Sequence, residues 1–272
     1  MVSAPRFIAS DIDGTFIDPA HRVTARTRDV VVRAIESGAH FALATGRPYR
    51  WIAPVLEQLP VRPLCVTSNG AVVYDSLADR VVRAEELSPA VMAGIVERAE
   101  EVLGSIAVAA ERAGTSAADP TEDMYVVDAP FAARTDYPGF GVADRAEVVA
   151  EPAVKLIVRN LNMTSAQMYA RLAPLVDATD AHVTYSMPDG LLEIAAPGVT
   201  KERGVSYLAE HYGVAASEVI VFGDMPNDIE MLRWAGCGVA MGNAHDDVKE
   251  AADIVTKTNG QAGVAHVLER WF

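Results

Sequence analysis

The sequence predicts an α/β protein whose parallel sheet is interrupted by an inserted domain. Short apolar runs alternate with helical patterns at both ends of the chain, which is typical of β-α units that feed a parallel sheet. Polar residues directly follow several of these runs, where open parallel sheets bind their ligands. In the middle of the chain a predicted hairpin breaks the alternation. We therefore expect the two ends of the chain to form one Rossmann-like core.

The first β-α units occupy residues 7–67. Residues 7–9 predict a buried strand, and Thr24 suits the N-cap of a helix that runs through Glu36 and ends at Gly38. The next elements are a strand at 40–44, a helix opened by Pro48 and a third strand at 64–67.

A different pattern begins after residue 70. Residues 71–74 and 80–83 predict a hairpin, and the segment that follows predicts a mixed α+β domain. Its expected elements are a helix after Ser88, strands at 106–110, 154–158 and 182–186, and a helix at 165–176. Residues 113–151, rich in Gly, Pro, Asp and Ala, predict no regular element.

The β-α alternation resumes with a helix capped by Thr200. The expected elements after it are a strand at 219–222, a helix at 229–234, a strand at 238–240 and a last helix at 261–272. Because residues 191–195 are expected to return the chain to the core, we predict a core of residues 1–83 and 190–272 and an inserted domain of residues 84–189.

Composition excludes several classes of protein. The chain has 272 residues and a formal net charge of −14, and such an acidic surface repels the nucleic-acid backbone. No run approaches the roughly 18 apolar residues that cross a bilayer, and no secretory segment is recognisable. The two cysteines, Cys65 and Cys237, are expected to be buried free thiols. We expect a cytoplasmic protein, monomeric or homodimeric, with no nucleic-acid or membrane partner.

Acidic and hydroxyl side chains gather at the predicted strand ends. The first strand leads into Asp11-Ile12-Asp13-Gly14-Thr15, and a late strand leads into Gly223-Asp224 with Asn227-Asp228. Crowded carboxylates repel one another unless a cation lies between them, and a few oxygen ligands suit Mg²⁺. Asn227-Asp228 alone is also a plausible cap of the following helix.

This set of residues suits phosphoryl transfer. A carboxylate at Asp11 can attack phosphorus and form an aspartyl-phosphate, while a second carboxyl at Asp13 protonates the leaving alcohol and later deprotonates water. Thr45 and Lys201 would stabilise the phosphoryl oxygens. Lys201 stands at a predicted helix start, which favours an anion. Arg47, beside Thr45, is either a ligand or an ion-pair residue.

Four of these segments, in their order along the chain, resemble the four motifs of the haloacid dehalogenase superfamily. They are Asp11-Ile12-Asp13-Gly14-Thr15, the segment of Thr45, Lys201, and Gly223-Asp224 with Asn227-Asp228. The long insertion between the second and third motifs resembles the Cof-type phosphatase branch, subfamily IIB, with a C2-type cap. Further segments that carry this resemblance are Ser68-Asn69-Gly70-Ala71, Leu192-Glu193-Ile194 and Met241-Gly242-Asn243-Ala244.

The resemblance implies a role for each matched residue. Asp11 would be the nucleophile and Asp13 the general acid/base. The implied Mg²⁺ ligands are Asp11, the main-chain carbonyl of Asp13, Asp224 and Asp228, and the implied phosphate-binding residues are Thr45, Gly46, Asn69 and Lys201. Relatives often have glycine directly after the lysine, whereas here Glu202 and Arg203 precede Gly204.

These observations predict a Mg²⁺-dependent phosphatase that hydrolyses a small phosphomonoester, with a sugar phosphate favoured by resemblance. The alternatives are a phosphomutase, and a phospho-acceptor or ligand-binding module without turnover. The inserted domain is expected to act as a substrate-selecting lid. Its candidate substrate contacts are Arg112, Tyr125, Arg134 and Tyr137.

Overall fold

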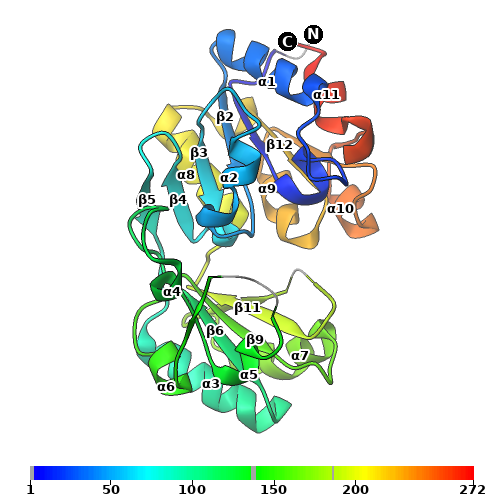
Figure 1. Cartoon of the computed structure of the whole chain (residues 1–272). Helices are drawn as coiled ribbons and strands as arrows, with labels where there is room; N and C mark the ends of the chain where they lie inside the picture. Colours follow the sequence, from blue (N-terminus) through cyan, green and yellow to red (C-terminus); the bar gives the residue numbers. More distant parts are fainter. Residues whose placement is uncertain (1–2, 136–138, 186) are drawn as a thin grey trace. The chain divides into compact units, whose positions relative to one another are not determined.

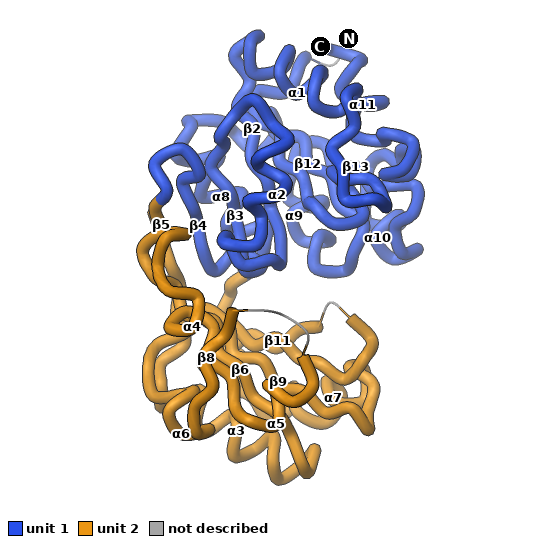
Figure 2. Tube along the Cα trace, in the orientation of Figure 1, with its two compact units in different colours: residues 1–79, 200–272 blue, residues 80–199 orange. Residues whose placement is uncertain are grey.

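The computed structural model describes residues 3–135, 139–185 and 187–272. The chain divides into two compact units: residues 1–79 with 200–272 form the first, and residues 80–199 form the second (Figure 2). No helix in the described part of the chain is both long and apolar enough to cross a membrane.

Seven strands of an eight-stranded sheet form the centre of the first unit, and the eighth strand, β5, consists of the first residues of the second unit. The strands of this sheet run in the order β14-β13-β12-β1-β2-β3-β4-β5. Their bounds are β1 (Phe7–Ser10), β2 (His40–Ala44), β3 (Leu64–Thr67), β4 (Val72–Asp75), β5 (Arg80–Ala84), β12 (Val219–Gly223), β13 (Cys237–Ala240) and β14 (Ile254–Val255). The six strands from β14 to β3 pair in parallel, and β4 turns back antiparallel to β3.

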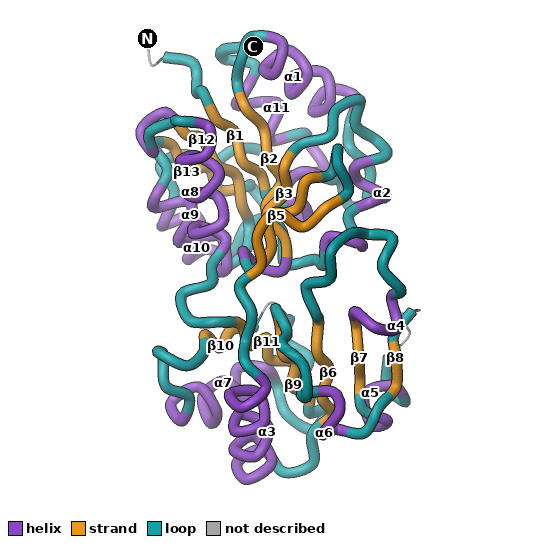
Figure 3. Tube along the Cα trace, turned by 90° about the vertical axis from the view of Figure 1, so that its left-hand side faces the viewer, coloured by secondary structure: helices purple, strands orange, loops and turns teal. Residues whose placement is uncertain are grey.

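Helices cover both faces of this sheet, as Figures 1 and 3 show. On one face lie α8 (Lys201–Tyr212) and α9 (Ile229–Trp234); on the other lie α1 (Ala25–Glu36) and α11 (Gly263–Leu268), which pack side by side. The remaining short helices are α2 (Ala53–Leu56) and α10 (Asp246–Ala251). As predicted, Thr24 caps α1, its hydroxyl accepting from the backbone N–H of Thr27.

The strand order creates a switch point beside β1. From β1 the chain adds β2 and then β3 on one side, whereas β12, β13 and β14 extend the sheet on the other side. Helices from opposite faces therefore diverge at the carboxyl ends of β1 and β12, where doubly wound sheets bind ligands. Asp11 and Asp224 follow these two neighbouring strands.

The second unit is a six-stranded sheet packed against helices. Its strand order is β10-β11-β9-β6-β7-β8. The strand bounds are β6 (Ala107–Glu111), β7 (Tyr125–Val127), β8 (Gly141–Val142), β9 (Lys155–Arg159), β10 (His182–Thr184) and β11 (Leu191–Ala195). The helices are α3 (Pro89–Leu103), α4 (Thr121–Met124), α5 (Ala129–Ala132), α6 (Arg145–Val148) and α7 (Ser165–Leu172). Leu156, Leu192 and Met168 are among the residues of its apolar core.

Among the differences from the sequence-based expectation, two concern the second unit. Residues 191–195 form β11, which pairs antiparallel with β9 and β10 instead of returning to the first sheet. Leu192 and Ile194 are fully buried in the core of the second unit, and this burial keeps the strand there. Residues 113–151, for which no element was predicted, contain α4, β7, α5, β8 and α6, each too short to show a period.

A glycine lets helix α8 approach β3 closely. A Cβ added at Gly204 would lie 2.4 Å from Cγ1 of the fully buried Val66. Since Val66 is β-branched and enclosed, it has little room to yield. Gly204 therefore sets the distance between the sheet and the helix that begins at Lys201.

We expect Gly204→Ala to lower the free energy of unfolding by about 1–3 kcal/mol, because the added methyl group overpacks the contact with Val66. The matched control is Gly94→Ala in α3, where an added Cβ has no heavy atom within 4 Å. That change should raise stability by about 0.5–1 kcal/mol. Urea unfolding followed by circular dichroism measures both; equal effects would contradict the role of Gly204.

Candidate active site

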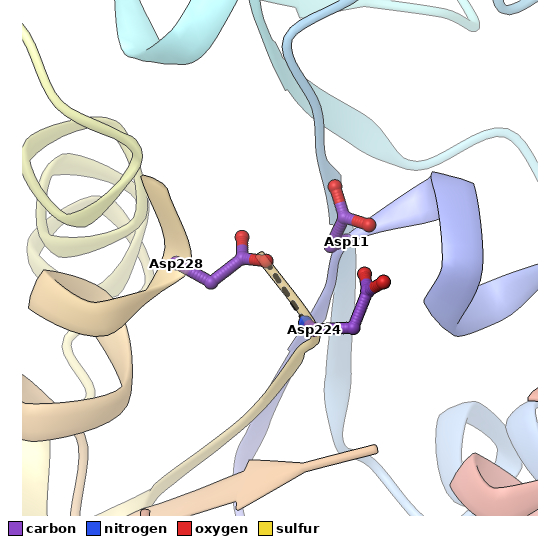
Figure 4. A group of neighbouring side chains, drawn as sticks. All are labelled: Asp11, Asp224 and Asp228. Atoms are coloured by element: carbon purple, nitrogen blue, oxygen red, sulfur yellow. Dashed lines mark hydrogen bonds between the residues drawn. The ribbon is translucent and has the colours of Figure 1, made fainter. Parts of the chain in front are cut away.

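Three aspartates from two neighbouring strand ends converge in the first unit (Figure 4). Asp11 follows β1 and Asp224 follows β12, and the register places Ser10 opposite Phe222. Asp228 lies on the short helical turn Pro226–Asp228. One carboxylate oxygen from each aspartate lies within 4.8 Å of those of the other two. All three residues are buried, with relative exposures of 4%, 7% and 0% for Asp11, Asp224 and Asp228.

The backbone holds Asp228 in place. Its Oδ2 accepts hydrogen bonds from the backbone N–H groups of Asp224 and Met225, both at 3.0 Å. Gly223 makes this approach possible, because a Cβ there would lie 2.5 Å from the Cβ of Asp228. Asp228 thus closes the turn that precedes it and also faces the other carboxylates. Its side chain makes no capping hydrogen bond to the following helix α9, so the expectation that it caps that helix is wrong.

Lys201 lies between two of the carboxylates. Its Nζ donates to Asp11 Oδ1 at 2.6 Å and to Asp228 Oδ1 at 2.8 Å, and its side chain is 2% exposed. Lys201 is the first residue of α8, and the hydroxyl of its N-cap Thr200 accepts from the backbone N–H of Arg203. Glu202 and Arg203, which separate Lys201 from Gly204, therefore leave Lys201 at the start of the helix.

Burial and mutual repulsion shape the protonation of the cluster. Burial raises the pKa of Asp11 well above its ordinary value; Lys201 acts in the opposite direction, and the carboxylates of Asp228 and Asp224 raise it further. Burial and Asp228 also raise the pKa of Asp224 to about 6. Burial alone would lower the pKa of Lys201, but Asp11 and Asp228 more than reverse this and raise it.

The donor set suits a hard cation. Three buried carboxylates face one bonded ammonium group, so with all groups ionised two negative charges are left over. Leaving such charge buried is costly, and carboxylate oxygens are preferred ligands of divalent cations such as Mg²⁺. Asp11, Asp224 and Asp228 are therefore the residues that could hold a metal.

Asp13 points elsewhere. Its carboxylate accepts from Arg47 Nε at 2.7 Å and from a second guanidinium nitrogen, and its side chain is half exposed. The side chain of Asp13 is outside the carboxylate cluster. Of the two interpretations of Arg47, the described contacts show the ion pair.

A glycine lets the turn that carries Asp13 meet Asp224. Gly14 has φ +75°, and a Cβ on it would lie 2.2 Å from Asp224 Oδ2. A side chain at position 14 would therefore displace the carboxylate, in addition to straining the backbone.

Thr45, Gly46 and Asn69 come together beside this cluster of strand ends. Thr45 follows β2; its carbonyl accepts from the N–H of Asn69 at 3.0 Å and its hydroxyl accepts from the N–H of Arg47 at 3.1 Å. A Cβ on Gly46 would lie 2.8 Å from Asn69 Oδ1. Asn69 has φ +58°, a conformation that asparagine tolerates better than most residues. Three of the four predicted phosphate-binding residues thus lie in one packed pair of loops, whereas the fourth, Lys201, lies among the aspartates.

Sequence reasoning assigned no role to three polar residues at the site. Thr15 donates its hydroxyl proton to Asp224 Oδ1 at 2.9 Å, and Asn243 Nδ2 donates to Asp224 Oδ2 at 3.4 Å. Asn227 Nδ2 donates to Asn69 Oδ1 at 3.0 Å. All three belong to segments that were recognised as motifs, but only the fold shows which carboxylate or amide each one meets.

The candidate contacts in the second unit have partners within that unit. Arg112 donates to the carbonyl of Asp123 and pairs with Glu151 at 3.4 Å. Tyr125 is 7% exposed, and the carbonyl of Arg134 accepts from Arg159. Tyr137 lies outside the described residues.

Comparisons with known proteins agree on one family. The family model for haloacid dehalogenase-like hydrolases matches residues 8–268. The chain is 29% identical over 279 residues to the 5-amino-6-(5-phospho-D-ribitylamino)uracil phosphatase YitU of Bacillus subtilis, covering all of this chain and 99% of that protein. It is 26% identical over 269 residues to the HMP-PP phosphatase of Cronobacter sakazakii, covering 98% of this chain and 95% of that one.

Solved structures show the same fold. The phosphatase BT1666 of Bacteroides thetaiotaomicron superposes with a TM-score of 0.82 at 25% identity, covering 98% of this chain and 95% of that one. The structure of TM0651 from Thermotoga maritima has a TM-score of 0.77 at 27% identity, with 98% of each chain covered. The chain therefore belongs to the haloacid dehalogenase-like hydrolases and is a phosphatase of their Cof-type branch.

Proposed function

We propose that the protein is a Mg²⁺-dependent phosphatase that hydrolyses a small phosphomonoester through an aspartyl-phosphate on Asp11. The observation that carries this proposal is the convergence of Asp11, Asp224 and Asp228 around Lys201 at one end of the parallel sheet. Buried ion pairs contribute little to stability compared with a packed apolar core, and here one carboxylate of the cluster, Asp224, has no cationic partner among the described contacts.

The metal would be held by Asp11, Asp224 and Asp228, and by the main-chain carbonyl of Asp13 as the family resemblance implies. When bound, Mg²⁺ would neutralise the carboxylates and the phosphoryl oxygens, so that two anions can approach each other. The excess negative charge of the cluster supports this assignment.

In the first half-reaction a carboxylate oxygen of Asp11 attacks phosphorus, and the bond between phosphorus and the ester oxygen breaks. Asp13 gives its proton to the departing alkoxide, so the product leaves as an alcohol. In the second half-reaction Asp13 takes a proton from water, whose oxygen attacks phosphorus and releases Asp11 and inorganic phosphate. Lys201 and the loop pair of Thr45, Gly46 and Asn69 would bind the phosphoryl oxygens throughout.

The ion pair between Arg47 and Asp13 supports this division of roles. It fixes an otherwise half-exposed carboxylate in one orientation, away from the buried cluster. Asp11, in contrast, is buried among the metal-binding oxygens. The two aspartates of one turn therefore lie in different environments, as distinct nucleophile and acid/base roles require.

The proposed substrates are small sugar or polyol phosphates. The acidic chain disfavours phosphate polymers. The relatives named above act on a ribitylamino-uracil phosphate and on HMP-PP, which suggests a panel of small phosphorylated metabolites that includes both, together with hexose and pentose phosphates. The second unit is proposed to select among them.

We expect the wild-type protein to release inorganic phosphate from p-nitrophenyl phosphate and from members of this panel when Mg²⁺ is present. Asp11→Asn should lower kcat at least about 10³-fold, because the amide is not a nucleophile. The matched control is Asp246→Asn, whose side chain is 95% exposed; it should keep wild-type activity.

Phosphate release also separates the alternatives. A phosphomutase would convert one sugar phosphate to its isomer without releasing phosphate in step with turnover. A phospho-acceptor module would incorporate label from a small phosphodonor once and then stop. Either pattern, in place of continuous metal-dependent release, would refute the phosphatase proposal.

Removal of the acid/base should depend on the leaving group. Asp13→Asn is expected to lower kcat about 10²–10⁴-fold for an alkyl phosphate, because the alkoxide needs a proton to leave. p-Nitrophenolate leaves without a proton, so the rate of phosphoenzyme formation from p-nitrophenyl phosphate should fall much less. Rapid-quench measurement of the phosphoenzyme with both substrates tests this; equal losses in the first step would contradict the acid role of Asp13.

Metal binding should be pH dependent because of Asp224. Its pKa of about 6 lies above the ordinary 3.8, so its ionised form opposes folding of the metal-free protein above about pH 6. This cost is relieved as the pH falls through 6 toward 4. With EDTA present, stability should therefore rise over that range by up to about 3 kcal/mol from this group.

Mg²⁺ should reverse this trend, since bound metal stabilises the ionised form. Thermal unfolding is measured with Mg²⁺ and with EDTA, at about pH 8 and about pH 5. Mg²⁺ should raise the Tm by a large amount only at the higher pH. In Asp224→Asn the shift should nearly vanish at both. A Mg²⁺ effect that is equal at the two pH values would exclude Asp224 as a ligand.

A further inference from the structure

Asn243 joins three segments that meet at the carboxylate cluster. Its Nδ2 donates to the carbonyl of Gly14 at 2.8 Å and to Asp224 Oδ2 at 3.4 Å, and its Oδ1 accepts from the backbone N–H of Asn259 at 2.9 Å. Asn243 follows β13, whereas these partners follow β1, β12 and β14. One amide therefore links the loops at the ends of three other strands.

The link is reinforced from its far side. Asn259 Nδ2 donates to the carbonyl of Ile17 at 2.8 Å, so the turn of residues 12–17 is held at Gly14 by Asn243 and at Ile17 by Asn259. The N–H of Gly242 donates to the carbonyl of Lys257 at 3.0 Å, which ties the loop of Asn243 to the segment that precedes Asn259. These hydrogen bonds hold the loop of Asn243 in place, although the side chain of Asn243 is exposed.

We infer that Asn243 is a positioning residue for the metal site, acting through Asp224 and the turn that carries Asp13. The two oxygens of Asp224 receive one neutral donor each, Thr15 on Oδ1 and Asn243 on Oδ2. Together they fix the rotation of the carboxylate, which also lies against the bare Cα of Gly14. Neutral donors orient a metal ligand without competing for its charge.

The contact with Gly14 has a second consequence. The peptide between Gly14 and Thr15 is held through its carbonyl, and it is adjacent to the peptide that carries the Asp13 carbonyl. A free Gly14, with φ +75°, would give this turn many alternative conformations. Asn243 removes that freedom and so reduces the ordering cost of binding an ion.

This inference rests on the proposed function, and its test separates the two. Titration of Mg²⁺ into the substrate-free protein by calorimetry measures metal affinity without catalysis. For Asn243→Ala we expect an increase in the metal Kd of about tenfold. Wild-type protein that binds no divalent ion would refute the proposed metal site itself. Wild-type binding with an Asn243→Ala Kd within twofold of it would refute only the positioning role.

Two further variants distinguish a local effect on metal binding from a general loss of structure. Asn243→Ser keeps a polar side chain that is too short to reach Gly14 and Asp224, and it should match the alanine variant. His245→Ala changes an exposed imidazole in the same loop and should keep the wild-type Kd. Metal-free unfolding midpoints identify any variant that is misfolded; if both Asn243 variants bind as wild type does while folded, the inference fails.

Kinetics supply a readout that a purely structural role would not move. The Mg²⁺ concentration for half-maximal activity should rise about tenfold in Asn243→Ala, while KM for p-nitrophenyl phosphate at saturating Mg²⁺ stays near the wild-type value. Thr15→Val, which removes the other donor to Asp224 at nearly constant shape, should shift the same parameter in the same direction. Loss of kcat that saturating Mg²⁺ does not restore would overturn the proposal.

Discussion

The crowding of three carboxylates around one ammonium group governs the structure of the first unit. Asp11, Asp224 and Asp228 are all nearly inaccessible to water, yet Lys201 bonds to only two of them. In a low-dielectric interior this is unfavourable for the folded state by itself. The surrounding chain must therefore hold the cluster against its own repulsion, and most of the unusual features nearby serve that purpose.

Glycine occurs where the crowding is tightest. At Gly14 and Gly223 the space of a side chain is taken by Asp224 and Asp228 respectively. At Gly70, with φ +103°, a Cβ would lie 2.0 Å from the carbonyl of Thr200, so the loop after β3 touches the first turn of α8. The positions of Lys201 and the two aspartates thus depend on close backbone approach, because side-chain packing alone could not bring charged groups this near.

Topology explains why so much of this was predictable from the sequence. Strand β2 begins and ends where the apolar pattern predicts, and Asp11, Thr45 and Asp224 all follow predicted strands. In a parallel sheet, residues that follow strands share one edge, so a one-dimensional pattern is enough to place them together. What periodicity could not give was the pairing of side chains across loops, such as Arg47 with Asp13 or Asn243 with Asp224. Nor could it assign Leu191–Ala195 to a sheet, since a short, mostly apolar strand fits either one until its partners are known.

A second buried lysine shows what distinguishes the candidate site from an ordinary ion cluster. In the second unit Lys155 lies 2.8 Å from Glu193 and 3.9 Å from Glu111, on adjacent strands of the sheet. Lys201 is likewise paired with two carboxylates, those of Asp11 and Asp228. The difference is Asp224, whose described bonding partners are a hydroxyl and an amide, both neutral. Neutral donors orient a carboxylate without cancelling its charge, so the metal site that we propose depends on Asp224 in a way that the Lys155 cluster cannot reproduce.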